Sequence, residues 1–292
     1  QQRRGQRRII ETIDLYEYFH LPRGGAKGGY LTAYRHGQSA EVYKKIRPAM
    51  LVIAGGGYAM VSDREKEPVA LRFYAAGYDA FALGYSVSPE HYPVQLLQAG
   101  MAMLYLRREA ARLELDGEHI AAVGFSAGAH LCGCISVLWD DAALVSAFGK
   151  EECERIRPDA AIFSYPVITG DARYWHEGSF VNFSGGTVKA EDYSLEKKVR
   201  PSVPPCFIWA TSEDTAVPAE NSLLLYGALH RAGVPAELHI FEKGAHGLSL
   251  CSAETAWGCG KGEGVSEHAA HWVELALEFL AEHGFAMRKA EK

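Results

Sequence analysis

Continuous apolar runs of strand length alternate with segments of helical periodicity along most of this chain. Runs bounded by glycine, proline or polar residues are typical of strands buried on both faces of a sheet. They occupy residues 49–58, 78–85, 119–125, 159–167, 205–214 and 235–241. Apolar residues at helical spacing occupy residues 64–77, 93–113, 219–233 and 266–284. This alternation predicts crossover connections and an α/β architecture, a mostly parallel, doubly wound sheet with helices on both faces.

Two further regions depart from this alternation. Near the N-terminus, residues 9–19, 28–36 and 40–48 show partial alternation of apolar and polar positions, which predicts antiparallel strands at one edge of the sheet. Between about 170 and 205, aromatic, glycine, serine and charged residues follow one another with weak periodicity. Loops of this length are uncommon unless they serve a function, so we expect a small lid-like insertion or covering loop there.

The composition is that of an ordinary globular protein. The chain has 292 residues, 48% of them hydrophobic and 23% charged, which is long enough to bury a sizeable core. We expect residues 9–292 to form a single domain after a flexible basic tail at residues 1–8. The formal net charge of −6 disfavours nucleic acid, and no run approaches the roughly 18 to 20 apolar residues of a spanning helix. We therefore expect no nucleic-acid or membrane partner, and a homodimer stays open.

The cysteine and histidine patterns indicate neither a disulfide framework nor a metal centre. The six cysteines are scattered through apolar stretches, unlike those of a small disulfide-stapled domain. Reduced thiols in a cytoplasmic protein fit better, with a leader removed ahead of Gln1 as an open alternative. No Cys-x-x-Cys pair occurs, and His268 with His271 lacks an evident third ligand, so we expect no metal.

The first candidate for chemistry is Ser126, in the stretch Gly-Phe-Ser-Ala-Gly at residues 124–128. This G-x-S-x-G pattern follows a buried strand and precedes a helical segment, as in turns that lift a nucleophilic serine above a parallel sheet. The flanking glycines permit the turn because side chains there would collide with neighbouring backbone. We expect His130, one helical turn further on, to pack rather than to act in catalysis.

A serine hydroxyl needs a base that takes its proton and an acid that orients the base. His246 is the candidate base because it lies on a glycine-flanked loop after a predicted strand. Asp214, just past the end of another predicted strand, is the candidate acid, and it falls in the required order Ser, acid, His. Its neighbour Glu213 would face the other way, and Asp171 is a less favoured substitute.

Attack by a serine creates an oxyanion, which a glycine-rich loop can stabilise. One preorganised donor is worth about 2.7–4 kcal/mol. Here Gly56 and Gly57 lie at the end of the first buried run, and their N–H groups would act with that of Ala127, the residue after the candidate nucleophile. A nucleotide-binding loop would instead need G-x-G-x-x-G opening a helix, or a lysine after the last glycine, and neither is present.

Four motifs, AGGGY, GFSAGAHL, SEDTAVP and KGAHGL, together resemble the α/β-hydrolase superfamily, and within it the esterase and lipase group that includes acetyl-xylan esterase-like proteins. The resemblance covers about residues 45–282. One departure is Ala54, where many relatives carry a histidine that helps to shape the glycine loop. The resemblance implies an α/β-hydrolase fold, in which the weakly periodic stretch at about 170–205 would be the lid-like insertion.

The activity implied by this resemblance is that of a serine carboxylesterase without metal or cofactor. It would hydrolyse short-chain, acetyl-type esters of small molecules through an acyl-serine intermediate, with acetylated sugars or xylo-oligosaccharides as candidate substrates. The resemblance implies that Ser126 is the nucleophile, Asp214 the orienting acid and His246 the general base. It implies that the amides of Gly56, Gly57 and Ala127 form the oxyanion hole.

Other readings of the same residues stay open. Tyr58 and Trp175 are weaker candidates for stacking on a substrate, because aromatic residues in covering loops are as often packed. The same three catalytic residue types could cleave an amide, as in arylformamidase-like or peptidase-like enzymes. A non-catalytic binding protein built on a hydrolase scaffold is the third alternative.

Overall fold

The structure is a computed structural model that describes residues 10–37, 41, 45–257 and 263–289. Its strands are β1 (Ile10–Asp14), β2 (Tyr30–Tyr34), β3 (Lys45–Ile53), β4 (Asp79–Gly84), β5 (Leu115–Phe125), β6 (Ala160–Ser164), β7 (Cys206–Thr211), β8 (Ala236–Phe241) and β9 (Arg288–Lys289). Within the described residues they form one sheet in the order β1-β2-β4-β3-β5-β6-β7-β8, with β9 paired to β3. Neighbouring strands from β4 to β8 in this order are parallel, whereas β2 is antiparallel to both β1 and β4.

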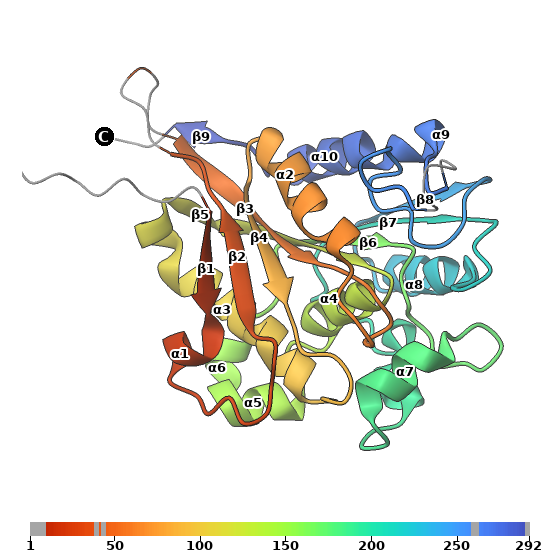
Figure 1. Ribbon diagram of the computed structural model, residues 1–292, viewed down its shortest axis with the longest axis horizontal. Coiled ribbons are helices and arrows are strands. Elements are labelled where there is room, and N and C mark those ends of the chain that lie inside the picture. The colour runs from red at the N-terminus through yellow and green to blue at the C-terminus, as the bar shows by residue number, and fades with distance from the viewer. Residues whose placement is uncertain (1–9, 38–40, 42–44, 258–262, 290–292) are drawn as a thin grey trace, which may run out of the picture.

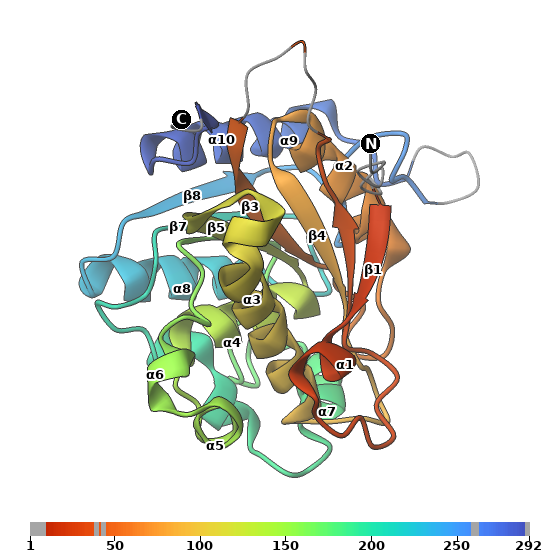
Figure 2. The ribbon, with the colours of Figure 1, turned by 90° about the vertical axis from the view of Figure 1, so that its left-hand side faces the viewer.

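Helices cover both faces of this sheet (Figures 1 and 2). They are α1 (Leu15–Phe19), α2 (Glu67–Ala75), α3 (Val94–Leu113), α4 (Ala127–Val137), α5 (Ala142–Phe148), α6 (Lys150–Cys153), α7 (Glu177–Ser184), α8 (Glu220–Arg231), α9 (Glu267–Ala270) and α10 (Trp272–Glu282). Short 3-10 turns are η1 (Asp63–Glu65), η2 (Ala190–Tyr193) and η3 (Leu195–Lys197). Helices α2 and α10 pack on one face, and α3, α4 and α8 pack on the other.

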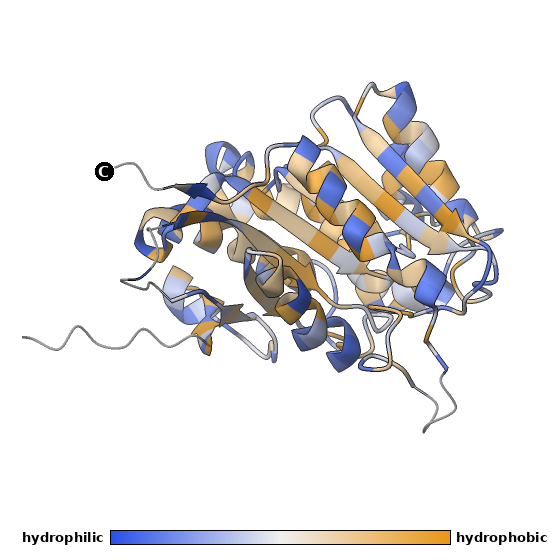
Figure 3. Cartoon of the chain, turned by 90° about the horizontal axis from the view of Figure 1, so that it is seen from above, coloured by the Kyte–Doolittle hydropathy of each residue, from blue (hydrophilic) through white to orange (hydrophobic). Residues whose placement is uncertain are grey.

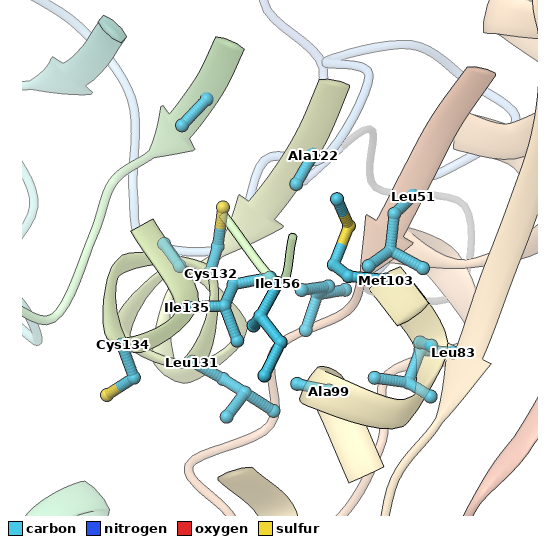
Figure 4. Packing of buried hydrophobic residues seen from close by; sticks show 14 of the residues in the cluster. Leu51, Leu83, Ala99, Met103, Ala122, Leu131, Cys132, Cys134, Ile135 and Ile156 are labelled. Atoms are coloured by element: carbon cyan, nitrogen blue, oxygen red, sulfur yellow. The ribbon is translucent and has the colours of Figure 1, made fainter. Parts of the chain in front are cut away.

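The central strands are apolar throughout because each of their faces meets a layer of helices. In β3, Met50 and Val52 belong to the core beneath α2 and α10, whereas Leu51 and Ile53 belong to the core on the opposite side. Figure 4 shows part of this second core, where side chains of β3, β4 and β5 meet those of α3 and α4. Hydrophobic residues predominate in the strands of the sheet, and hydrophilic residues lie on the exposed faces of the helices (Figure 3).

The predicted fold class is confirmed: the sheet is mostly parallel, with antiparallel strands β1 and β2 at the N-terminal edge. Two local predictions were wrong. In the segment predicted at 40–48, residues 45–48 do not belong to an edge strand, because they begin β3, which lies between β4 and β5, and only residues 45–47 are partly exposed. Residues 40 and 42–44 lie outside the described residues. In the segment predicted at 9–19, residues 10–14 form β1, but the Asp14 carboxylate accepts the Glu17 N–H at 3.1 Å and starts α1.

The region between 170 and 205 is more ordered than its weak periodicity predicted. It contains α7, η2 and η3, and it buries Phe180 and Phe183 against the main core. The predicted basic tail at residues 1–8 lies outside the described residues. Among the described helices, none alone is long and apolar enough to cross a bilayer; the bent pair α4 and α5 passes that test only when taken together.

Candidate active site

Ser126 lies in the sharp connection between β5 and α4. Its backbone adopts φ 52° and ψ −119°, a left-handed conformation that side chains seldom take, and only 7% of the residue is exposed. The Ser126 N–H donates to the Ser164 carbonyl at 3.0 Å, and the Ser126 carbonyl accepts from Ala129 and His130. These hydrogen bonds fix the strained turn between the sheet and the helix.

The two glycines that flank the serine have no room for side chains. A Cβ on Gly124 would lie 2.5 Å from the Ala129 Cα atom, and one on Gly128 would lie 2.3 Å from the Ala54 carbonyl oxygen. Both distances are far below a van der Waals contact. The predicted reason for the glycines is therefore confirmed by the packing around the turn.

His246 and Asp214 reach Ser126 from two neighbouring strands. His246 follows β8, and its Nε2 atom lies 2.8 Å from the Ser126 Oγ atom. The Nδ1 atom of the same ring lies 2.6 Å from Oδ2 of Asp214, which follows β7 and has a fully buried carboxylate. The other Asp214 oxygen accepts the N–H groups of Ala216 and Val217, each at 2.9 Å, so the carboxylate cannot turn away from the ring.

The two alternative acids point elsewhere. Glu213 is exposed, and its carboxylate bonds the Lys243 ammonium at 3.0 Å and the Gly244 N–H at 3.1 Å. Asp171 pairs with the Arg173 guanidinium, which lowers the pKa of that carboxyl group to about 2. Of the three candidate carboxylates, Asp214 is the one in contact with His246.

The glycine loop after β3 packs directly against the serine turn. A Cβ on Gly55 would lie 3.0 Å from the Ser126 Cβ. The Tyr85 hydroxyl donates to the Ala54 carbonyl at 2.7 Å, and the Asn182 amide of α7 donates to the Gly57 carbonyl at 2.9 Å. These contacts brace the loop on both sides of the three glycines.

Three backbone donors lie beside Ser126. Within the described part of the chain, the N–H groups of Gly56, Gly57 and Ala127 form no hydrogen bond. Ala127 is the first residue of α4, whose leading N–H groups have no partner inside the helix. Gly56 and Gly57 have φ 121° and 65°, so the loop takes a path that a residue with a side chain would seldom follow. Free amide donors are what an oxyanion requires.

A buried carboxylate connects the glycine loop to the histidine loop. Glu65 of η1 is 3% exposed; its Oε2 accepts the Gly55 N–H at 2.8 Å and its Oε1 accepts the Tyr165 hydroxyl at 2.6 Å. Burial and the adjacent Glu65 raise the pKa of Tyr165 well above 10, so its hydroxyl stays a donor. Tyr165 also accepts the Ser249 N–H at 2.9 Å and packs edge-on against the His246 ring, with centroids 5.1 Å apart.

These groups surround a cavity of about 410 Å³ that opens above the serine turn. Its walls come from the glycine loop, η1, the serine turn, the histidine loop and the residue before α7. They are lined by Gly56, Gly57, Met60, Ser62, Arg64, Glu65, Ser126, His176, His246 and Gly247. The cavity thus brings a hydroxyl, an imidazole and backbone donors to one place.

Comparisons with known proteins show the family to which the chain belongs. Residues 38–169 match the family described as BD-FAE, and residues 166–283 match the prolyl oligopeptidase family. The structure is similar to that of an acetyl ester-xyloside bifunctional hydrolase from Caldicellulosiruptor lactoaceticus, with a TM-score of 0.78 and 33% identity over 94% of this chain and 97% of that one. The chain belongs to the esterase-like α/β-hydrolases.

Two curated relatives of this α/β-hydrolase are longer proteins. Endo-1,4-beta-xylanase B of Butyrivibrio fibrisolvens is 38% identical over 241 residues, which are 80% of this chain and 36% of the xylanase. An acetylxylan esterase of Xylanibacter ruminicola is 28% identical over 210 residues, which are 69% of this chain and 41% of the esterase. The chain thus spans about two-fifths of the length of these curated relatives.

Three aromatic or histidine predictions for this α/β-hydrolase have different outcomes. The prediction that Tyr58 stacks on a substrate was wrong, because Tyr58 is completely buried and its hydroxyl lies 2.9 Å from the His130 Nδ1 atom. His130 packs in the core as predicted, and burial lowers its pKa to about 4. Trp175 stacks on Phe180 and lines a separate hollow that includes Asp171, so it does not line the cavity at Ser126.

Sequence reasoning missed the cavity residues Glu65, Arg64 and His176. Glu65 and Arg64 lie in a highly charged stretch that reads as a solvated helix start, and nothing in that pattern marks them as buried or braced. His176 stands among aromatic residues in the weakly periodic region. Its position one residue before a helix is a cap signal only once α7 is known.

Replacing Glu65 with glutamine is expected to destabilise this α/β-hydrolase. Glutamine offers one oxygen to two buried donors, so its amide group would face either the Gly55 N–H or the Tyr165 hydroxyl. A buried donor left without an acceptor costs about 1–3 kcal/mol, and each kcal/mol lowers the thermal midpoint by roughly 2–4 °C. Thermal unfolding followed by circular dichroism measures the shift.

The matched control for this variant is Asp63→Asn, two residues away in the same turn. The Asp63 side chain is 90% exposed and, among the described residues, pairs only with Lys66, so the unfolding midpoint of this variant should stay close to that of the wild type. If Glu65→Gln and Asp63→Asn unfold at the same temperature, the role assigned to the buried carboxylate is wrong.

Proposed function

We propose that this chain is a serine carboxylesterase that hydrolyses short-chain, acetyl-type esters through an acyl-serine intermediate. The observation that carries the proposal is the relay of Ser126, His246 and Asp214, with contacts of 2.8 and 2.6 Å, beside a cavity walled by the glycine loop. We further propose acetylated sugars or xylo-oligosaccharides as the substrate class, on the printed names of the xylanase, the acetylxylan esterase and the acetyl ester-xyloside hydrolase.

In the first half of the proposed reaction, the Ser126 Oγ atom attacks the ester carbonyl carbon. Its proton passes to Nε2 of His246, and the Asp214 carboxylate stabilises the resulting imidazolium through Nδ1–H. The carbonyl oxygen becomes an oxyanion that the free N–H groups of Gly56, Gly57 and Ala127 would bind. The C–O bond to the alcohol then breaks, and the departing oxygen takes the proton from Nε2.

In the second half, a water molecule attacks the acyl-serine carbonyl. His246 takes a proton from the water, the same amide donors bind the second oxyanion, and the acid leaves as Ser126 recovers its proton. Both halves use one imidazole at one position. No group other than the residues already in contact is required for these proton transfers.

A preference for short acyl groups is the first property to test, and the printed names of the acetylxylan esterase and the acetyl ester-xyloside hydrolase support it. We expect kcat/KM for p-nitrophenyl acetate to exceed that for the octanoate by at least about tenfold, because a site that selects acetyl groups discriminates against added methylenes. Spectrophotometric rates across acetate, butyrate, hexanoate and octanoate measure this, with Ser126→Ala as the background. Equal or higher rates on octanoate would count against an acetyl-type esterase.

The amide alternative is tested by the same preparation. The match of residues 166–283 to the prolyl oligopeptidase family gives this alternative a specific basis. N-formylkynurenine and a peptide anilide are the amide substrates, and acetate release from acetylated xylo-oligosaccharides is the ester counterpart. We expect turnover of the esters only; turnover of an amide with no ester hydrolysis would replace the proposed bond specificity.

A further inference from the structure

His176 is a cavity residue supplied by the lid-like region rather than by the strand ends. It is the N-cap of α7: its Nδ1 atom accepts the Ser179 N–H at 3.2 Å and lies 2.8 Å from the Ser179 hydroxyl. The helix it caps also reaches the glycine loop through the Asn182 amide and the Gly57 carbonyl, 2.9 Å apart. The position of His176 is therefore fixed relative to the proposed oxyanion donors.

The cap contact determines which ring nitrogen carries the proton. A backbone N–H can donate only to an imidazole nitrogen that holds a lone pair, so Nδ1 is unprotonated and the proton of the neutral ring is on Nε2. Burial lowers the pKa of His176, and nearby His246 lowers it further, while Asp214 acts in the opposite direction. The neutral form with Nε2–H is thus the form that caps α7.

The Nε2–H group has no acceptor in the described part of the chain, although the ring lines the same cavity as Ser126 and His246. The Cε1 atom, which is bonded to Nε2, would lie 3.9 Å from a Cβ on Gly57. A polar donor at a cavity wall beside the glycine loop is available to a ligand. Its partner must offer an oxygen or nitrogen lone pair.

Resting on the proposed function, we propose that His176 donates from Nε2–H to a hydroxyl oxygen on the alcohol part of the ester, and so selects esters of polyhydroxylated alcohols. The acetyl methyl has no acceptor. The carbonyl oxygen is already served by the N–H groups of Gly56, Gly57 and Ala127. The bridging ester oxygen takes its proton from His246 in the proposed reaction, so the acceptors left in an acetylated sugar are its hydroxyl and ring oxygens. His176 is thereby a specificity-determining residue contributed by the lid-like region.

The test compares two acetates that differ in hydroxyl groups, a methyl xyloside carrying one acetyl group and cyclohexyl acetate. His176→Asn is the informative variant, because asparagine is a preferred N-cap but is too short to present a donor in place of Nε2. We expect the ratio of kcat/KM between the xyloside and the cyclohexyl ester to fall roughly tenfold, the worth of one hydrogen bond of about 1.4 kcal/mol. His176→Ser, another good cap, gives a second reading of the same ratio.

The matched control is Glu177→Gln, an exposed residue in the first turn of α7, which should leave the ratio within about twofold of the wild type. An unchanged ratio in both His176 variants, with both esters still hydrolysed, overturns this inference and leaves the proposed function standing. An equal loss on both esters also overturns it, since His176 would then act on the shared chemistry. No turnover of either ester by the wild type overturns the proposed function together with the inference.

Discussion

Replacing Ser126 with alanine is expected to lower kcat for p-nitrophenyl acetate about 10⁶-fold while leaving the fold in place. The hydroxyl removed is the one 2.8 Å from the His246 ring, and the remaining donors can only bind and polarise the ester. The turn itself depends on backbone hydrogen bonds to Ser164, Ala129 and His130, which alanine retains. Steady-state rates measure the loss, and thermal unfolding verifies that the variant is folded.

Ser212→Ala is the matched control for this loss. Ser212 is an exposed serine two residues before Asp214, and its N–H, which alanine keeps, donates to the Phe241 carbonyl at 2.8 Å. Its activity should stay close to that of the wild type. If Ser126→Ala retains more than a small fraction of the wild-type rate, Ser126 is not the nucleophile.

Asp214→Asn is expected to lower kcat about 10⁴-fold, the effect of neutralising an acid in this position of a serine, histidine and aspartate relay. The Asp214 oxygen accepts from Nδ1 of His246, whereas an asparagine amide placed there would donate to Nδ1. The ring proton would then move to Nε2, the nitrogen that faces the Ser126 hydroxyl. A protonated Nε2 has no lone pair with which to accept the proton of that hydroxyl. Rates on p-nitrophenyl acetate quantify the change.

The control substitution for this experiment is Asp171→Asn. Asp171 pairs with Arg173 at the surface and makes no contact with His246, so its loss should change kcat by less than about twofold. A severe loss of kcat in Asp171→Asn combined with a mild loss in Asp214→Asn would show that the assignment of the acid to Asp214 is wrong.

The residues of the relay could be predicted from sequence because each follows a buried strand. Parallel strands bring their carboxyl ends to one edge of the sheet, so Ser126 after β5, Asp214 after β7 and His246 after β8 converge there. The expectation that Glu213 and Asp214 face opposite ways rested on extended backbone. Their carboxylates do point apart, but residues 212 and 213 lie in a turn after β7. These inferences need only the strand order and the spacing of side chains.

The rest of the site depends on contacts that no local pattern encodes. Glu65 is buried because Gly55, 10 residues earlier, and Tyr165, 100 residues later, both donate to it. His176 reaches the cavity because α7 folds onto the glycine loop, which the weak periodicity of that region did not reveal. Tyr58 misled the prediction for a related reason: its φ of 56° directs the ring into the core toward His130 rather than toward the cavity.

The central claim concerns one oxygen atom, and covalent labelling addresses it most directly. A fluorophosphonate should react with the wild-type enzyme at one molecule per chain, abolish esterase activity, and appear by peptide mass mapping on Ser126 alone. Under the same conditions Ser126→Ala should remain unlabelled. Absence of labelling, as in an inert binding scaffold, or inactivation with the label on another residue, would contradict the account.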